Sequence, residues 1–390
     1  MSDPVIVSTA RTAIGTARKG SLANTTGEEL ASFILQEAVR RSGLDPALVE
    51  DVIFAESQYG GGDLARYAAV VAGMTEVPGQ AVNRHCAGSL TAIGNAAGSI
   101  KSGMDRAVVA GGVQATSLSP QLRQRVPGTA DDYQDWYPAT HPDSPEAPNM
   151  DMSISVGWNT AKAAGVTREE MDAWAYRSHM RAVAATDAGK FVDEIAPIKV
   201  TAPDGSVREF AVDEHPRRTS TLEKLASLKV LHPEIPGFSI TAGNASGVND
   251  AAAAVTLTSQ ALADAEGLTS MATVRAWASA GVDPALMGFG ALRAAAKVTE
   301  RAGVSLSDVL LWEINEAFAS VPVAACKEFG LDEENVNFSG SGCSLGHPVA
   351  ASGARMVITL IHELRRRGGG IGVASMCAGG GQGGAVLIEV

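Results

Sequence analysis

Residues 81–100, AVNRHCAGSLTAIGNAAGSI, followed at residues 107–112 by AVVAGG, decide the fold class of this chain. A faint repeat of this order occurs at residues 335–357, NVNFSGSGCSLGHPVAASGARMV, followed at residues 372–380 by GVASMCAGG. Each stretch has the pattern of a strand, a tight turn with a reactive side chain, a helix of small residues and a strand that ends in Gly-Gly. The repeat predicts two similar halves, with Cys86 and His347 at related helix starts that face one site.

Short apolar runs outside the repeat predict the remaining framework. A helical pattern at residues 28–41 ends at Gly43. Strands that alternate with helices indicate an α/β fold with largely parallel sheets. Buried strands are expected at residues 5–8, 52–55, 107–110, 273–277, 309–314 and 371–376.

Residues 118–240 break this alternation, because Pro, Asp and polar residues gather in DDYQDWYPATHPDSPEAP at residues 131–148. We interpret this section as an inserted loop domain. Thr167 and Glu170 form a capping-box pattern that predicts the start of a helix through Trp174 and His179. The two halves are then expected at residues 1–117 with 241–268, and at residues 269–390.

The composition excludes several classes of protein. Hydrophobic residues make up 45% of the 390 residues, which allows a large buried core. The formal net charge of −12 argues against nucleic acid or an anionic membrane as the main partner, so an anionic substrate would need a local basic patch. The amino-terminal sequence has no secretory pattern, and a cytoplasmic protein is expected. The four cysteines form no Cys-x-x-Cys pair, which argues against a zinc site or a disulfide framework.

Cys86 lies where a strand is expected to meet a helix, so its sulfur should lie near unpaired backbone N–H groups that favour the thiolate. His347 lies between a glycine-rich turn and a helix expected over residues 350–367. Both residues also have an ordinary interpretation. A single cysteine is often a small buried apolar residue, and a histidine at a helix start can be a cap or part of the core.

Two further polar side chains follow apolar strands. Cys377 ends a predicted strand and precedes three glycines, where bare backbone can approach a ligand and donate hydrogen bonds. Asn315 follows another strand, and polar side chains at the carboxyl ends of strands often face the site of an α/β protein. Cys377 can equally be a strand-end residue beside a loop, and Asn315 can cap the next helix. None of these four residues is decisive alone.

Six sequence blocks together resemble the thiolase family over nearly the whole chain. They are VNRHCAGSL at residues 82–90, TAGNASGVNDAAAA at 241–254, GVDPALMGFG at 281–290, NEAFA at 315–319, SLGHPVAASGAR at 344–355 and CAGGGQGG at 377–384. The resemblance implies a thiolase-like fold of two similar α-β-α halves with mixed sheets, and a loop domain that covers a CoA channel. It also implies an acyltransferase that cleaves 3-ketoacyl-CoA with CoA, or condenses two acyl-CoA molecules, through an acyl-cysteine.

The resemblance also implies a role for each reactive group. Cys86 would be the acylated nucleophile, His347 its base, and Cys377 the second acid and base. His347, with a water held by Asn315, would stabilise the enolate oxygen, while the N–H groups of Cys86 and Gly379 would stabilise the thioester oxygen. CoA is then a substrate, no metal or redox cofactor is implied, and a homodimer or homotetramer is expected.

Contacts to CoA are implied for residues 213–229, DEHPRRTSTLEKLASLK, which resemble the family's nucleotide-contacting segment. Arg217, Arg218 and Lys224 would supply the positive charge that the acidic chain otherwise lacks. The resemblance suggests a contact from Ser246 to the pantetheine arm and places Phe318 in the acyl pocket. The basic segment can equally be a solvated surface, and Phe318 a core residue.

Several positions depart from the usual family pattern. In Ala87-Gly88-Ser89, the serine and glycine that commonly follow the nucleophile are exchanged. Gln114 stands where a glutamate is usual, and Pro-Val-Ala at residues 348–350 stands where Pro-Ile-Gly is usual. Residues 149–159, NMDMSISVGWN, lack the His-Met-Gly that short-chain biosynthetic members usually carry. A short acetoacetyl unit and a longer or branched 3-ketoacyl chain therefore both stay open, as does the direction of the reaction.

Two other functions compete with this interpretation. A catalytically silent protein that only binds acyl-CoA would lack one of the reactive groups, yet all four are present. A decarboxylating ketoacyl synthase would pair its cysteine with two histidines, or with a histidine and an asparagine, and Cys377 argues against it. A purely structural protein has no positive feature in its favour.

Overall fold

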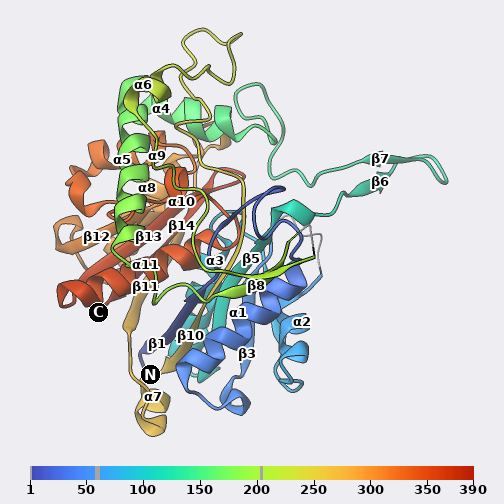
Figure 1. Cartoon of the computed structure of the whole chain (residues 1–390), viewed down its shortest axis with the longest axis vertical. Helices are drawn as coiled ribbons and strands as arrows, with labels where there is room; N and C mark the ends of the chain where they lie inside the picture. Colours follow the sequence, from blue (N-terminus) through green and yellow to red (C-terminus); the bar gives the residue numbers. More distant parts are fainter. Residues whose placement is uncertain (1, 58–61, 203–204) are drawn as a thin grey trace.

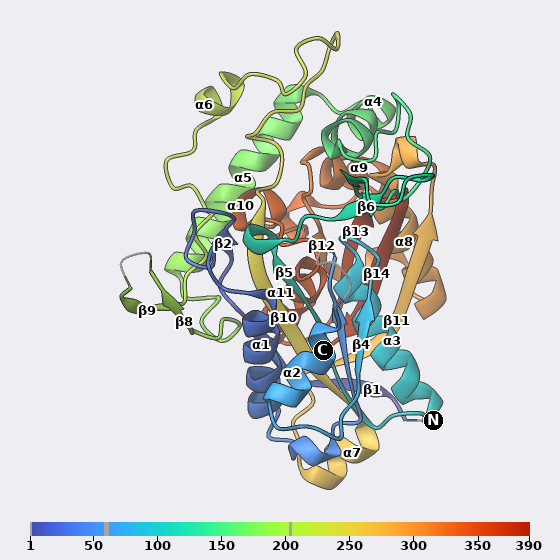
Figure 2. The ribbon, with the colours of Figure 1, turned by 90° about the vertical axis from the view of Figure 1, so that its right-hand side faces the viewer.

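The computed structural model describes residues 2–57, 62–202 and 205–390 (Figure 1). Its main sheet has ten strands in two groups, and helices lie outside each group and between them (Figures 1 and 2). Within these residues, none of the helices combines the length and the apolar character that a membrane crossing requires.

The amino-terminal group of strands has the order β1-β10-β5-β3-β4. β3 (Asp51–Ala55) pairs in parallel with β4 (Gly79–Val82) and with β5 (Ala107–Ala115). β10 (Asn249–Ser259) lies antiparallel between β5 and β1 (Pro4–Arg11), and its first two residues also pair with β2 (Gly15–Thr16). Every residue of β1, β5 and β10 is buried, which fits strands in the middle of a layered core.

The carboxyl-terminal group repeats this order. β12 (Val309–Ile314) is parallel to β13 (Ile371–Ala378), and β14 (Gln382–Glu389) lies antiparallel between β13 and β11 (Ala272–Gly281). β12, β13, β14 and β11 thus correspond to β3, β5, β10 and β1. Two residue pairs between β1 and β11 join the groups into one sheet. The expected mixed α/β fold with two similar halves is confirmed.

The expectation of largely parallel sheets was wrong, because most strand pairs are antiparallel. The connection from β13 to β14 is only residues 379–381, and a turn this short can join only antiparallel strands. In the first half, the chain leaves β5, passes through the long excursion and returns in β10 antiparallel to β5. The periodicity of apolar residues predicts helices and strands, but it does not predict that β10 and β14 run antiparallel to the strands before them.

Three large apolar cores lie between the sheet and the helices that cover it. The central core holds α3 (Gly88–Ser102) and α11 (Ser352–Arg367), which pack against each other and against both groups of strands. The outer helices are amphipathic, and α1 is bounded by a capping box at Thr26 and by the left-handed Gly43. They are α1 (Gly27–Ser42) and α2 (Leu64–Val71) on the first half, and α8 (Phe289–Ala302) and α9 (Ser320–Phe329) on the second.

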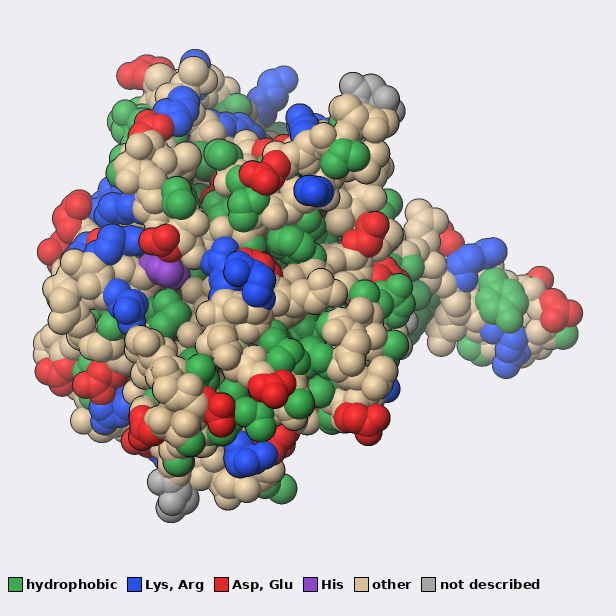
Figure 3. Space-filling view, turned by 60° about the horizontal axis from the view of Figure 1, so that its bottom comes forward, with side chains coloured by type: hydrophobic (Ala, Val, Ile, Leu, Met, Phe, Trp, Pro, Cys, Tyr) green, Lys and Arg blue, Asp and Glu red, His purple; other side chains and the backbone are tan. Residues whose placement is uncertain are grey.

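Residues 118–240 spread over both halves. The hairpin of β6 and β7 forms an arm that stands clear of the body (Figures 1 and 3). The predicted helix is confirmed as α5, whose capping box joins Thr167 and Glu170. The first part of α5 enters the core of the second half through Met171, Trp174 and Ala175. Its last part enters the core of the first half through Ala182 and Ala185, as do Phe191 and Phe210. The elements are β6 (Arg123–Arg125), β7 (Tyr133–Asp135), a π-helical turn (Ser153–Trp158), α4 (Asn159–Ala164), α5 (Arg168–Asp187), β8 (Ile198–Thr201), β9 (Val207–Phe210) and α6 (Leu222–Ala226).

Candidate active site

The two helix starts that the repeat singled out meet in the central layer. α3 begins directly after the turn that carries Cys86, and α11 begins five residues after His347. Ser89 Oγ on α3 accepts a hydrogen bond from Ala354 N–H on α11 at 3.0 Å. The fold therefore brings the segments of Cys86 and His347, which are far apart in sequence, to the same end of the central helix pair.

The Cys86 side chain is half-buried, and its sulfur faces two backbone donors. Burial raises the pKa of Cys86 to about 11, although the N–H groups of Cys86 and Gly379 face Sγ and act in the opposite direction. The N–H groups are where the sequence predicted them, but they do not make the resting sulfur a thiolate. Cys86 therefore needs a base before it can attack a carbonyl.

Cys377 is the next reactive group, near the end of β13. Burial and then the nearby Cys86 raise the pKa of the Cys377 thiol well above its usual value. Cys377 is therefore protonated at neutral pH and can give a proton to a strongly basic carbanion or enolate. The glycines that follow it form the turn that carries the Gly379 N–H.

The ring of His347 is held in one tautomer. Ser352 Oγ donates its proton to Pro348 O at 2.9 Å, so His347 Nδ1, which lies 2.7 Å from Ser352 Oγ, must be the donor in that contact. His347 Nε2 then carries a lone pair. Burial and then the charge of Arg355 lower the pKa of His347 to about 4, so the ring is neutral at pH 7 and can act as a base.

The backbone of His347 is fixed from the first half of the chain. Its N–H donates to Asn249 Oδ1 at 3.0 Å, while Asn249 Nδ2 donates to Gly15 O at 3.0 Å. Gly346 has a φ of +99°, and a Cβ there would lie 2.3 Å from Asn249 Oδ1, so only glycine fits. Asn249 and Ser352 were not among the predicted site residues, although both lie inside the quoted sequence blocks.

Asn315 lies beside the ring of His347. Its Nδ2 is 3.4 Å from each ring nitrogen, and its backbone N–H is held by Ser375 O. Asn315 Oδ1 is buried and has no hydrogen-bond partner within the described part of the chain. An unpaired buried oxygen is costly unless a ligand or water uses it, so this atom can accept a bond from a group in the site.

Glu316 holds the NEAFA turn from behind. Its carboxylate accepts hydrogen bonds from Trp174 Nε1 and Ser178 Oγ on α5 and from Cys343 N–H. Asn337 Nδ2 is a fourth donor, at 2.8 Å, so four neutral donors satisfy the buried carboxylate, and two of them tie α5 to the turn that carries Asn315.

The TAGNASG and NEAFA blocks lie side by side. Ser246 N–H donates to Ala317 O at 2.9 Å, and Ala245 pairs with Phe318 in an isolated bridge. Phe318 is buried, and a Cβ added at Gly157 would lie 3.0 Å from its ring. Phe318 thus packs on the π-helical turn, in the segment that lacks the His-Met-Gly usual in short-chain biosynthetic thiolases.

The predicted CoA contacts on residues 213–229 lie on the surface. Arg217, Arg218 and Lys224 are exposed. Arg218 pairs with Asp187 at 2.7 Å, Lys224 Nζ donates to a carbonyl of its own loop, and Arg217 N–H donates to His179 Nδ1. Within the described residues, no hydrogen bond or ion pair joins these three side chains to the Cys86 region.

The departures from the family pattern fit the structure. Gly88 is the first residue of α3, where a Cβ would lie 2.7 Å from that of Ala55, and Ser89 makes the link to α11. Gln114 Oε1 accepts a hydrogen bond from Ala350 N–H at 3.2 Å, so two of the departures lie in contact. The exchange after Cys86 therefore leaves the helix start intact.

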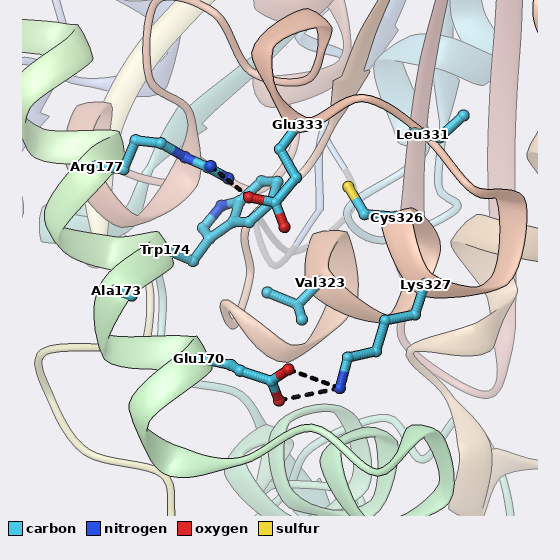
Figure 4. Close-up of a pocket in the computed structure, with 9 residues that line it drawn as sticks. All are labelled: Glu170, Ala173, Trp174, Arg177, Val323, Cys326, Lys327, Leu331 and Glu333. Carbon is cyan, nitrogen blue, oxygen red and sulfur yellow. Dashed lines mark hydrogen bonds and ion pairs between the residues drawn. The ribbon is translucent and has the colours of Figure 1, made fainter.

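A separate hollow of about 300 Å³ lies between α5 and α9 (Figure 4). Ion pairs of Glu170 with Lys327 and of Arg177 with Glu333 border it. Burial raises the pKa of Cys326 in this hollow to about 12, so its thiol is unreactive at neutral pH. The hollow contains none of the predicted site residues. In residues 2–57, 62–202 and 205–390, no three His, Cys, Asp or Glu side chains gather as metal ligands.

Comparisons with known proteins agree with this geometry. Residues 4–261 match the family model "Thiolase, N-terminal domain", and residues 268–390 match "Thiolase, C-terminal domain". An acetyl-CoA acetyltransferase of Pseudomonas aeruginosa is 40% identical, and a 3-ketoacyl-CoA thiolase of Bacillus subtilis is 36% identical; the matches cover 100% of this chain with 99% and 100% of those proteins. The crystal structure of the Bacillus anthracis acetyl-CoA acetyltransferase aligns with a TM-score of 0.90 at 41% identity, covering 100% of this chain and 99% of that one. This chain belongs to the thiolase family.

Proposed function

We propose that this thiolase cleaves 3-ketoacyl-CoA with CoA, and runs the reverse condensation of two acyl-CoA molecules, through an acyl group on Cys86. The observation that carries the proposal is the surroundings of the Cys86 sulfur, which faces the N–H groups of Cys86 and Gly379 and lies near Cys377. Nucleophile, oxyanion donors and a second acid are thereby placed together.

In the first half-reaction, His347 Nε2 takes the proton of the Cys86 thiol, and the thiolate attacks the 3-keto carbon. The N–H groups of Cys86 and Gly379 stabilise the oxyanion that forms. The C2–C3 bond then breaks, and the departing enolate takes a proton from Cys377. His347 and a water held by Asn315 stabilise the enolate oxygen, which fits the unpaired Oδ1 of Asn315.

In the second half-reaction, the Cys377 thiolate takes the proton of the CoA thiol. The CoA sulfur attacks the thioester on Cys86, and the same two backbone donors stabilise the new oxyanion. The Cys86 thiolate leaves and recovers its proton from His347. Protons balance over the cycle, and CoA enters as a substrate, so the sequence of steps uses no metal or redox cofactor.

The acyl-CoA is proposed to lie along residues 213–229 and to reach the site past Ser246 and Phe318. Arg217 and Lys224 would face its phosphates, because both side chains are exposed and the chain is otherwise acidic. The relatives include both acetyl-CoA acetyltransferases and 3-ketoacyl-CoA thiolases, so short and longer 3-ketoacyl chains are both candidate substrates. The silent alternative has no support from the relatives' names.

We also propose a homodimer or homotetramer in the cytoplasm. Tyr133, Trp136 and Tyr137 are exposed on or beside the arm of β6 and β7, which stands clear of the body and would be covered in an assembly (Figure 3). Light scattering of the intact chain and of a variant without residues 123–135 tests this proposal, since a monomeric intact chain would contradict it.

The experiment that tests the function is thiolysis of acetoacetyl-CoA and of longer 3-ketoacyl-CoA esters, followed by loss of the enolate absorbance. The native protein should turn over at least one ester, and Cys86→Ser should not. The chain-length profile identifies the substrate class. Retained CoA binding with no turnover of any ester would instead indicate the silent binding protein.

A further inference from the structure

The glycine turn, residues 379–381, is held between two side chains that the sequence blocks did not single out. A Cβ added at Gly379 would lie 3.0 Å from Cγ of His85, so the imidazole ring packs on this glycine. A Cβ added at Gly380 would lie 3.0 Å from Cβ of Thr140. Because a side chain packs on each of these two consecutive glycines, the turn has little room to move.

His85 is held in place by its own backbone. Its φ is +45°, in the left-handed region that is unfavourable for a residue with a Cβ. Its N–H donates to Asn83 Oδ1 at 2.9 Å, and its carbonyl accepts a hydrogen bond from Ser57 Oγ at 3.0 Å. Burial lowers the pKa of His85, so the ring against Gly379 is neutral at pH 7. These contacts maintain a strained backbone directly before the nucleophile.

Thr140 belongs to a loop that is cross-linked internally. In this 140–149 loop, Asn149 Oδ1 accepts hydrogen bonds from Thr140 N–H at 3.0 Å and Oγ1 at 3.1 Å, and Asn149 Nδ2 donates to His141 O at 2.8 Å. Asn159 Nδ2, on α4, donates to Glu146 O at 2.8 Å. The loop therefore connects the glycine turn to the segment in which this chain departs from the family pattern.

We propose that His85 and the 140–149 loop are positioning elements that clamp the glycine turn and fix the Gly379 N–H against the Cys86 sulfur. His85 packs on Gly379 and Thr140 packs on Gly380, so both would act through the position of the Gly379 N–H. The inference rests on the proposed function, since the Gly379 N–H is one of its two oxyanion donors. Loosening the clamp moves this donor away from the position where charge develops, which costs rate more than substrate binding.

Thr140→Gly and Asn149→Ala test the loop, with Thr140→Ser as the conservative variant and Thr129→Ala as a matched control. Thr129 is on the arm, and its hydroxyl bonds only within the hairpin. Thr140→Gly should lower kcat of thiolysis about tenfold with KM nearly unchanged, because a displaced oxyanion donor weakens the transition state. Asn149→Ala should have a smaller effect in the same direction, while Thr140→Ser and Thr129→Ala should behave like the native protein.

His85→Ala and His85→Phe test the other side of the clamp. His85→Ala should lower kcat, and His85→Phe should restore much of it, because a ring against Gly379 is what the proposal requires. Recovery of kcat in His85→Phe would also show that packing of the ring matters and not proton transfer by the imidazole, because phenylalanine cannot carry a proton.

A second readout is the rate at which iodoacetamide alkylates Cys86 as a function of pH, measured on the peptide that contains Cys86. Loss of the Gly379 N–H should raise the apparent pKa of this reaction in Thr140→Gly and His85→Ala. The proposal is overturned if kcat and the alkylation profile stay native in both variants, or if kcat falls only in parallel with the melting temperature. Absence of thiolysis in the native protein would contradict the proposed function alone, because alkylation still tests the clamp.

Discussion

The two halves of the molecule use one topology to present different chemistry. In the first half, the turn before α3 carries Cys86, and β5 continues past its Gly-Gly pair to Ala115. In the second half, the segment before α11 carries His347, and β13 ends beside Cys377 and turns sharply into β14. In the proposed mechanism, the duplicated frame supplies the nucleophile from one half and the base and second acid from the other. Under this assignment, each half alone is chemically incomplete.

The largest expected effect follows from that division. Cys86→Ala and His347→Ala should each lower kcat of thiolysis by at least about 10³-fold, because nucleophile and base act as a unit. For the same reason, the double variant should be no slower than the slower single variant. Steady-state kinetics of the three variants check this. Near-native turnover in His347→Ala would show that the halves do not share the chemistry.

The second prediction separates the two reactive groups of the carboxyl-terminal half. Cys377→Ala should lower thiolysis by about 10²–10⁴-fold, because the enolate and the CoA thiol lose their acid and base. Alkylation of Cys86 by iodoacetamide should continue, since that reaction needs His347 and not Cys377. Cys326→Ser is the control, because Cys326 lies in the separate hollow between α5 and α9. Equal loss of alkylation and thiolysis in Cys377→Ala would contradict the assigned roles.

The third prediction concerns His179, on α5 of the inserted loop domain, residues 118–240. Burial, then His215 and Arg217, lower the pKa of His179 to about 4. Between pH 6.5 and 4 the unfolded chain binds a proton at His179 that the native state does not, so stability falls as pH falls through this window. His179→Phe should flatten this fall by about 1.4 kcal/mol per pH unit in urea unfolding. Glu313 changes the stability in the opposite direction, because its raised pKa favours protonation in the native state. This contribution is the same in both proteins, so it cancels when the slope of stability against pH is compared between the native protein and His179→Phe. Parallel slopes would mean that His179 is charged in the folded protein.

The smallest effect concerns the contact between the halves. Ser89→Ala removes the hydroxyl that accepts the Ala354 N–H and should lower the free energy of unfolding by about 1 kcal/mol. Thiolysis should change little. Ser102→Ala, at the exposed end of α3, is the matched control. A large loss of kcat with unchanged stability would instead place Ser89 in the chemistry.

The sequence was sufficient to predict the α/β frame of two similar halves. All six predicted strands and the helices after Cys86 and His347 are present, because burial and helix periodicity are local properties of the chain. The roles of the individual site residues stay predictions. The antiparallel direction of β10 and β14 was not predictable in the same way, since periodicity carries no information on strand direction.

The remaining features depend on long-range packing. Nothing local marks Asn249 as the residue that fixes His347, or Thr140 as a neighbour of Gly380. The raised pKa of Cys86 likewise follows from its burial against the central core, whereas the sequence indicated only the backbone donors that oppose it. Sequence patterns therefore predicted which side chains react, which stays a prediction, and the fold determines how each of these side chains is held and protonated.

The most direct test of the account is to trap the acyl-enzyme. The native protein, mixed with acetyl-CoA or a 3-ketoacyl-CoA ester and quenched in acid, should carry one acyl group, located on Cys86 by peptide mass spectrometry. The group should disappear when CoA is added before the quench, and it should be absent from Cys86→Ser. An acyl group on Cys377, or turnover of the ester without any acylated cysteine, would contradict the central claim that Cys86 is the nucleophile.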